Sequence, residues 1–567
     1  MTPLIIVVLY LFLLLGLGYM SKRQFRGTSR DYFVASHSIG PFFLLMSVFG
    51  TTMTAFALVG STGKAFERGI GVYGLMASMS GLVHVAVFFF IGVRLWSLGK
   101  KLGFVTQIQF FRARYDSATV GYVLFPILVL LVVPYLLIGI IGAGKTMLPV
   151  TAGALPQWFP NPATPQWAGG IPVWLTGLVV CGVVLSYVFM GGSRGAAWAN
   201  TFQTLVFMAM GLVAFVFIAN SLGGARQATE QAARFDDQGQ LIQTHRFDRE
   251  SRSMQANPVP KVIGTYQGDD PASVAGRRPL LSRTPIEVQL KTTDPASGDP
   301  VYFDRQFGIG KWMFFTYLFI PLSAGMFPHL FQNWLTARSA RAFRLTLVAH
   351  PLCILVVWVP CVLIGTWATG VLDPLPSSKT SSVLGAMVGL LVGSPILSGL
   401  LTAGILAAIM SSLDSQFLCL GTMFTNDIVL HAVGKNRFSD RQIILIARGF
   451  VVVVVALTYC LSLVAPGNVF DLAVWCFTGF SSLVPLVVAS LYWRRTTLAG
   501  VYASVGVAVG TWLTFFVDSG YGGEYAVGPG IIPAAICVLG ASVALVVVSL
   551  MTRPPSETTL DQFFPRK

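Results

Sequence analysis

The sequence predicts an all-α protein that crosses a membrane many times. Hydrophobic residues make up 54% of the 567 residues and charged residues only 11%, whereas a soluble domain has about a quarter charged residues. The mean hydropathy is +0.71. The apolar residues form runs of about 20 residues, the length of helix that crosses a hydrocarbon core of about 30 Å. We therefore expect a multi-pass protein of a cell membrane, surrounded by the lipid bilayer.

The apolar runs predict about thirteen transmembrane helices. Their expected positions are 3–20, 41–63, 72–94, 117–142, 171–190, 200–220, 310–335, 343–370, 396–420, 441–463, 468–492, 496–517 and 529–551. All seven cysteines fall in apolar segments, so we interpret them as packing residues rather than as a disulfide or zinc framework.

The distribution of charge predicts the orientation in the membrane. The net charge is +15, but Lys and Arg occur in short tracts between apolar runs, such as 21–30 and 94–114. This pattern follows the positive-inside rule and gives no indication of nucleic-acid binding. The alternate short loops 464–467 and 518–528 carry no Lys or Arg. We expect the N-terminus outside the cell and the C-terminus in the cytoplasm.

Residues 221–307 interrupt the membrane pattern with a polar segment that we expect outside the cytoplasm. Within it, 286–305 alternates apolar and polar residues around a turn sequence, which predicts a β-hairpin. The sequence leaves two interpretations of the segment open: a tolerated, partly disordered insertion, or an element that binds a partner or acts as a lid. The expected division of the chain is 1–40 (extra helix and loop), 41–220 (first repeat), 221–307 (insertion), 308–493 (second repeat) and 494–567 (two helices and a tail).

Two predicted spans contain interruptions. The second carries Gly50 and a cluster of threonines, and the seventh carries Pro321, Gly325 and Pro328. Non-helical backbone at membrane depth is tolerated where it lines a cavity. Because these spans lie five apart, each opens one half of a predicted five-plus-five inverted repeat, and the paired interruptions indicate a binding site near the midplane. The alternative is ordinary helix packing through small residues.

The ninth predicted span carries the main candidate ion site. Ala408, Ser411, Ser412 and Ser415 follow i, i+3, i+4, i+7 spacing and share one helix face. Hydroxyl and carbonyl oxygens of this kind can replace the hydration shell of a sodium ion. Asp414 stands beside that face, and an intramembrane carboxylate indicates function by default. For the serines alone, hydrogen bonding back to the preceding turn is the alternative interpretation.

Six stretches of the sequence resemble one known family. They are DYFVASHSIGPF (31–42), FVTQIQFFRARYDS (104–117), YVFMGGSRGAAWANTFQ (187–203), GMFPHLFQNWLTARSARAFR (325–344), AAIMSSLDSQ (407–416) and FSSLVPLVVASLYWRRTTLAG (480–500). Together they are similar to the sodium:solute symporter family, over almost the whole chain except 221–307. The resemblance implies ten core helices in two inverted repeats, with one helix before them and two after.

The resemblance also implies a sodium site between the second and ninth spans. Its ligands would be the backbone carbonyls of Gly50, Met53 and Ala408 and the hydroxyls of Ser411 and Ser412. The implied activity is sodium-coupled import of a small organic solute, with sodium as the coupling ion and no organic cofactor. We expect no enzymatic activity, since the sequence shows no HExxH, P-loop or GxSxG motif in a suitable setting.

One position departs from the family pattern. Many members have an Asp two residues after the motif Trp, whereas this chain has Asn200 after Trp198. An amide cannot neutralise a cation, which puts a second sodium site of the family's type in doubt. The candidate residues for ion coupling are Asp414, Ser415 and Asn200, and Asp414 can take over the role of the missing charge. The alternative is that Asp414 only orients Ser411 and backbone donors.

Solute contacts are expected at the two interruptions. By analogy with the family, the candidates at the interruptions are Thr54, Ala55, Phe56, Ile320, Ser323, Ala324 and Phe327. His84 and Trp475 are added because they can face the cavity. For His84 and Trp475, core packing is the alternative. Two other functions remain open at this stage: a proton-coupled carrier that uses Asp414 or His84, and a transport-like sensor.

Overall fold

The structure is a computed structural model, and it describes residues 1–23, 27–35, 38–160, 167–248, 250–282, 284–294, 297–434, 437–464 and 468–564. Ten helices in these ranges are long and apolar enough to cross a membrane: Thr2–Lys22, Gly74–Leu102, Ala118–Val150, Val173–Ser221, Ala340–Ala368, Pro395–Val433, Asp440–Val464, Val469–Tyr492, Leu498–Asp518 and Pro533–Met551. Two bent helix pairs raise the number to twelve. The predicted all-α membrane architecture is confirmed. This count takes Val173–Ser221 as one span and is one lower than the predicted thirteen.

The long helices of the bundle are α1 (Thr2–Lys22), α8 (Ala118–Val150), α9 (Val173–Ser221), α13 (Phe343–Ala368), α15 (Pro395–Met423), α17 (Asp440–Val464), α20 (Leu498–Asp518) and α21 (Pro533–Met551). A further span consists of α18 (Val469–Ser482) and α19 (Val484–Tyr492) together. The shorter helices are α2 (Ser29–Val34), α5 (Ser80–Ala86), α6 (Val93–Leu102), α7 (Gln107–Tyr115), α10 (Ala225–Glu230), α14 (Val383–Leu391), α16 (Leu430–Val433) and α22 (Glu557–Phe563). Two π-helical segments, Gly74–Met79 and Val87–Gly92, join α5 and α6 into one continuous span.

The difference from the predicted number of spans lies in α9. This helix has 49 residues and contains both predicted spans 171–190 and 200–220. At 1.5 Å per residue, a straight helix of this length would be more than twice as long as a hydrocarbon core of about 30 Å. The backbone leaves helical geometry at Gly192, with φ 56° and ψ −147°. Glycine adopts a positive φ without steric cost. Gly192 lies against Tyr32, beyond the end of α1, whereas Ser221 bonds to Leu391 of α14 at the other end of the bundle. The chain therefore turns back at Gly192, and α9 consists of two helices that correspond to the two predicted spans.

Both predicted interruptions are confirmed. The first pair consists of α3 (Pro41–Thr52) and the segment Phe56–Arg68, which contains α4 (Ser61–Arg68), and it bends by 54°. The second pair consists of Lys311–Gly325, which begins with α11 (Lys311–Thr316), and α12 (Pro328–Leu335), and it bends by 52°. Each pair begins one of the two inverted repeats, so the first helix of each repeat is broken at its middle.

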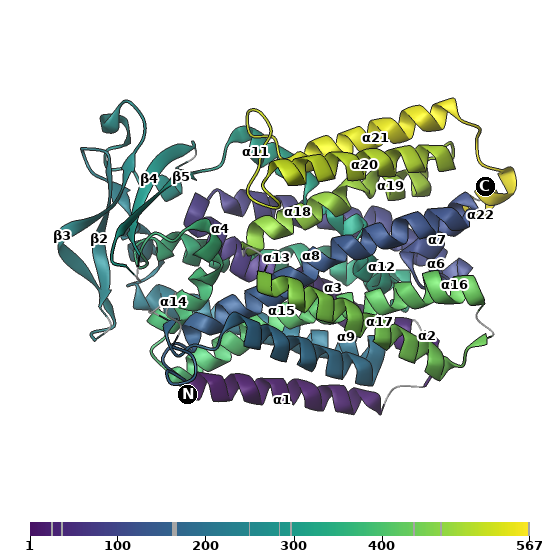
Figure 1. Cartoon of the computed structure of the whole chain (residues 1–567), viewed down its shortest axis with the longest axis horizontal. Helices are drawn as coiled ribbons and strands as arrows, with labels where there is room; N and C mark the ends of the chain where they lie inside the picture. The colour runs from purple at the N-terminus through teal and green to yellow at the C-terminus, as the bar shows by residue number, and fades with distance from the viewer. Residues whose placement is uncertain are drawn as a thin grey trace.

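Two short helices show the inverted relation of the repeats. α7 and α14 each have nine residues, and each follows the second spanning helix of its repeat. Figure 1 shows α14 at the end of the bundle where α1 begins and α7 toward the opposite end. Equivalent elements therefore lie at opposite ends, as an inverted repeat requires.

The two ends of the bundle differ. The five-stranded sheet lies at the end where α1 begins, which we call the sheet end (Figure 1). The C-terminal helix α22 lies at the opposite end, which we call the tail end. Lys101 and Arg494 donate to carbonyl oxygens of Gln562 and Phe564, so basic loops gather beside the tail.

The polar segment before α11 folds as an antiparallel sheet. Its strands follow one another in sequence order: β1 (Arg234–Phe235), β2 (Gln240–Asp248), β3 (Ser253–Tyr266), β4 (Ile286–Thr293) and β5 (Pro300–Phe307). The predicted hairpin is confirmed as β4 and β5, which pair from Ile286 with Phe307 to Thr293 with Pro300. A small apolar core of its own, which includes Phe235, Leu241 and Val288, stabilises the sheet.

The sheet is joined to the outer end of the first broken helix. Arg68 Nη1 donates to the backbone oxygen and the side-chain Oε1 of Gln306, at 2.8 Å each. The amide of Gly308 donates to the carbonyl oxygen of Arg68 at 2.8 Å. The end of α4 and the end of β5 are therefore one connected unit.

α15 is the central helix of the bundle. In its most hydrophobic window 83% of residues are buried, against 28% in α1. α15 packs on α9, α8, α3, α1 and α17. A polar group on α15 is therefore shielded from lipid and meets other helices of the protein.

Candidate functional site

The main candidate site lies where α3, α9 and α15 meet. α3 ends at Thr52, and Met53 leaves helical geometry with φ −89° and ψ 86°. The chain resumes a helical course at the π-helical segment Phe56–Gly60. Backbone carbonyls near such a break lose their partners in the following turn and become available to a ligand.

Ser411 joins α15 to the broken helix. Its Oγ is 2.8 Å from the carbonyl oxygen of Gly50 and 2.9 Å from that of Ala408. Three of the five predicted ligands therefore meet at one point, where Ser411 is fully buried. The Oγ of Ser412 donates to the carbonyl of Ile409 at 3.0 Å, in the preceding turn of its own helix. Met53 lies in the break itself and is also buried.

Thr204 on α9 is a neighbour of this point that the sequence did not reveal. Its Oγ1 donates to the carbonyl oxygen of Met46 at 3.1 Å. A Cβ placed on Gly50 would lie 2.3 Å from that hydroxyl, so α3 and α9 approach closely only because residue 50 is glycine. The signal was present in the sequence, because Thr204 is one helical turn after Asn200 and shares its face.

Asp414 lies next to Ser411 in a cluster of hydrogen-bond donors. Tyr187 Oη donates to one carboxylate oxygen and Ser415 Oγ to the other, at 3.1 Å each. The Asn200 amide nitrogen, oriented by these neighbours, lies 2.9 and 3.1 Å from the two carboxylate oxygens and 2.9 Å from the Ser411 carbonyl. Thr51 Oγ1 lies 3.0 Å from Ser415 Oγ. The predicted residues Asn200, Asp414 and Ser415 are therefore brought together, and Tyr187 and Thr51 complete the cluster.

The two breaks are joined by aromatic side chains. Phe56 and Phe327 both contact Phe477 of α18, with ring centroids 5.1 and 5.5 Å apart. Tyr135 of α8 contacts Phe327 and Phe477 at 5.3 Å each. This group of rings lies between the broken helices, where the midplane solute site was predicted. Sequence reasoning identified Phe56 and Phe327 but missed Tyr135.

Other predicted solute contacts serve the backbone or the packing. Thr54 Oγ1 accepts a hydrogen bond from the amide of Phe56 at 3.0 Å, and the side chain of Ala55 faces Gly142 of α8. The carbonyl of Ile320 accepts from Ser481 Oγ at 3.1 Å. Ser323 and Ala324 are buried in the 3₁₀ turn before the second break.

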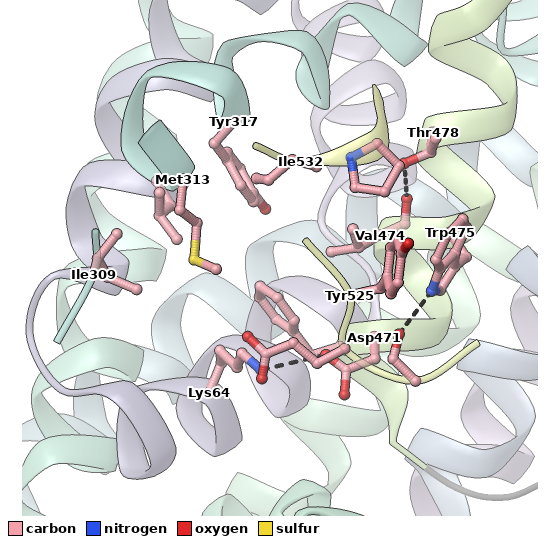
Figure 2. A pocket seen from close by; sticks show the side chains of 15 residues that line it. Lys64, Ile309, Met313, Tyr317, Asp471, Val474, Trp475, Thr478, Tyr525 and Ile532 are labelled. Carbon is pink, nitrogen blue, oxygen red and sulfur yellow. Dashed lines mark hydrogen bonds and ion pairs between the residues drawn. The ribbon is translucent and has the colours of Figure 1, made fainter. Parts of the chain in front are cut away.

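His84 and Trp475 lie apart from the aromatic group. His84 packs against Phe88 and His350, with ring centroids 5.8 and 5.4 Å apart, and His350 Nε2 lies 3.1 Å from Thr52 Oγ1. Trp475 donates to the carbonyl of Gly523 at 2.8 Å and lines a small cavity at the sheet end, shown in Figure 2.

That cavity contains charged residues that the sequence reasoning did not single out. Lys64 forms ion pairs with Glu67 at 3.1 Å, Asp471 at 3.3 Å and Glu524 at 2.8 Å. Burial would raise the pKa of Glu524, but Lys64 and Arg68 beside it hold that pKa below its ordinary value. Glu67 is three residues from Lys64, but Asp471 and Glu524 are 407 and 460 residues away in the sequence, which is why local patterns did not reveal the cluster.

Comparison with known proteins agrees with the fold. The profile of the sodium:solute symporter family matches residues 32–154 and 166–510, and the chain belongs to this family. It is 27% identical to the sodium/pantothenate symporter of Escherichia coli (strain K12) over 240 residues, 41% of this chain and 44% of the relative. It is 22% identical to the high-affinity proline transporter PutP of Bacillus subtilis (strain 168), over 97% of this chain and 98% of the relative.

Solved structures show the same architecture. A Na⁺-coupled sialic acid symporter in a substrate-bound outward-open state is similar over 98% of this chain and 99% of its own, with a TM-score of 0.66 and 15% identity. MHP1, a nucleobase-cation-symport-1 family transporter in a closed conformation with bromovinylhydantoin bound, covers 94% of this chain and 97% of its own, with a TM-score of 0.51 and 13% identity. At these identities the similarity defines the fold alone.

Proposed function

We propose that the protein is a symporter that uses the sodium gradient to import a small organic solute by alternating access. The observation that carries the proposal is the meeting of Ser411, Gly50 and Ala408 at the first break. Two neutral carbonyls and a hydroxyl there offer oxygen ligands to a sodium ion. Ser412 and Met53 complete the proposed site, with the Ser412 hydroxyl turning from Ile409 toward the ion.

The solute site is proposed between the two breaks, against Phe56, Phe327 and Phe477. The rings close over the midplane from both repeats, and the ends of the broken helices supply backbone groups that can bind a polar part of a solute. The E. coli relative is a pantothenate symporter and the B. subtilis relative a proline transporter. By the resemblance to the family, proline carriers use aromatic side chains at two positions where this chain has Ile320 and Ala324, so we propose a solute other than proline.

The proposed orientation places the tail end in the cytoplasm. Basic residues of the loops after α6 and α19 lie beside the C-terminal helix, and basic loops remain on the cytoplasmic side. The sheet end, with the start of α1, then faces outward. The solute would enter from the sheet end and leave at the tail end.

A second candidate coupling ion is the proton. The specific observation is Asp414, a fully buried carboxylate within 3.1 Å of Tyr187, Ser415 and Asn200 and adjacent in sequence to the serines. Such a group can bind a proton, or it can attract a further cation. Proton coupling predicts uptake that continues without sodium and falls as the pH rises.

The function is tested with purified protein reconstituted in liposomes. A thermal-shift screen of amino acids, sugars and small carboxylates, in sodium and in potassium buffer, first identifies solutes that stabilise the protein. A solute found in sodium only should then enter liposomes against its gradient when sodium is higher outside. Equal uptake with potassium in place of sodium would contradict sodium coupling, and stimulation by an inward proton gradient would favour the second candidate.

A further inference from the structure

Two of the ion pairs of Lys64 join the first broken helix to distant parts of the chain. Lys64 is on α4, in the outer half of the first broken helix, and its side chain is 4% exposed. Asp471 is near the start of α18, and Glu524 is in the loop between α20 and α21. Figure 2 shows the Lys64 side chain next to Asp471 at one edge of the cavity. Arg68, one turn further along α4, forms a second pair with Glu524 at 2.8 Å.

A layer of aromatic rings lies beneath these charges. Phe56 contacts Phe470 and Phe477 with ring centroids 5.1 Å apart in both pairs. The ammonium of Lys64 lies 5.2 Å from the centre of the Phe470 ring. Two successive layers, one charged and one aromatic, therefore join the first broken helix to α18 and separate the midplane site from the sheet end.

Buried ion pairs suit a contact that must open. A buried pair stabilises a structure little more than well-packed apolar side chains would, because both charges lose their hydration. When the contact opens, water hydrates each charge again, whereas an opened apolar contact exposes apolar area to water. Removing one partner while the contact stays closed is unfavourable, because the other charge is left buried alone. Such a contact can alternate between two states of similar free energy.

We propose that Lys64, Asp471 and Glu524 form a lock that holds the sheet end closed during the transport cycle. Lys64 is a positioning residue for the closed state and has no part in binding sodium or solute. The proposal rests on the proposed function, because alternating access requires the midplane site to be closed from each side in turn. It adds that the closure at this end depends on charge pairing between α4, α18 and the 519–532 loop.

The lock is tested by the accessibility of a cysteine behind it. Thr478 is buried and lines the cavity next to Lys64, so Thr478→Cys reports on opening. Among the described cysteines Cys460 is the exposed one, so the reporter is made with Cys460→Ser. Labelling of the purified protein by a hydrophilic maleimide is measured in potassium buffer, and the same protein without Thr478→Cys gives the background.

Lys64→Met should increase the labelling rate of the reporter about tenfold, because the population shifts to the open state. Lys64→Arg should restore slow labelling. The matched control is Lys261→Met, which removes an ion pair with Asp373 whose side chains are 54% and 57% exposed, and it should leave the rate unchanged. Asp471→Asn should act like Lys64→Met, and the two changes together should have less than the product of their separate effects.

An unchanged labelling rate in folded Lys64→Met protein would overturn the lock, and so would fully multiplicative effects of Lys64→Met and Asp471→Asn. If Lys64→Met does not fold, Glu524→Gln replaces it; the Glu524 side chain is 35% exposed, and an unchanged rate in this variant overturns the proposal equally. The labelling needs neither solute nor a sodium gradient. A protein that fails to transport with sodium but opens on loss of Lys64 would contradict the proposed function and leave the lock intact.

Discussion

At the scale of single residues, the contact between Gly50 and Thr204 determines how closely α3 approaches α9. Because a Cβ at residue 50 would lie 2.3 Å from Thr204 Oγ1, Gly50→Ala should destabilise the protein by the cost of overpacking, about 1–3 kcal/mol. Thr204→Ala removes that hydroxyl and should restore part of the loss in the double variant. The melting temperatures of the four proteins in detergent measure this. A double variant no more stable than Gly50→Ala would show that the clash is not with Thr204.

Asn200 on α9 and Asp414 on α15 are in hydrogen-bond contact, so mutation can place the carboxylate on either helix. Asn200→Asp alone places two carboxylates within hydrogen-bond distance, which repel each other unless a proton or cation binds. Asp414→Asn alone removes the charge. We expect each single variant to lose uptake at least about tenfold, which corresponds to a loss of about 1.4 kcal/mol in ion binding.

The exchange of the two residues is the control for this pair. In Asn200→Asp/Asp414→Asn protein the single charge returns, on α9 instead of α15, and uptake should recover to within a few fold of the original. Sodium activation curves of the four proteins test this. If the exchanged protein is as inactive as the worse single variant, a carboxylate on α9 cannot replace Asp414 on α15, and the proposed role of this charge in ion coupling is wrong.

At the scale of elements, α9 depends on a glycine where it is interrupted. Gly192 has a φ of 56°, and a Cβ there would lie 2.7 to 3.0 Å from atoms of Tyr32. Gly192→Ala should therefore lower the melting temperature. Gly182→Ala in the same helix meets no atom within 4 Å and should be neutral or slightly stabilising, by up to about 1 kcal/mol. Equal melting temperatures for the two variants would contradict this account of α9.

Elements with a local signal were predicted from the sequence. Gly50 predicted the first break, Pro321 and Pro328 the second, and alternation over 286–305 predicted the β4–β5 hairpin. β3 was missed because it contains Pro258 and Pro260 and because most of its side chains are exposed, so it shows no alternation. Residues 171–220 were divided into two spans, and the non-helical backbone at Gly192 separates two helices there.

The candidate site divides in the same way. Ser411 was found because its helical spacing places it on one face with Ala408 and Ser415. Lys64 was missed because its partners Asp471 and Glu524 are distant in sequence, and its pair with Glu67 is an ordinary i,i+3 pair of a helix. Tyr187 was part of a recognised motif, but its hydrogen bond to Asp414 depends on how α9 packs against α15.

At the scale of the whole molecule, one sodium ion is sufficient for useful uptake. Entry of one positive charge down a potential of about 100 mV releases about 2.3 kcal/mol, and a tenfold sodium gradient adds about 1.4 kcal/mol. Together they support accumulation of a neutral solute by about 500-fold at one-to-one coupling. A single sodium site, as proposed between α3 and α15, would therefore be enough for concentrative transport.

The structure shows how the ion site and the ends of the bundle are connected. The broken helix carries Gly50 at one side of its break and Lys64 toward the sheet end, and the inserted sheet is attached to its last residue, Arg68. A sodium ion between α3 and α15 would hold the inner half of this helix, while the ion pairs hold the outer half. The proposed sodium binding and the proposed closure would therefore act on the same broken helix, each on one of its two halves.

The central claim, a sodium site at Ser411 and Ser412, is tested most directly by binding of radioactive sodium to the purified protein at constant ionic strength. We predict saturable binding to the original protein that is lost in Ser411→Ala/Ser412→Ala. The matched control is Thr402→Val, which removes a buried hydroxyl from the same helix. Among the described residues this hydroxyl bonds only to the carbonyl of Ser398 in the preceding turn. The control variant should retain sodium binding. Sodium binding of unchanged affinity in the double serine variant would contradict the account.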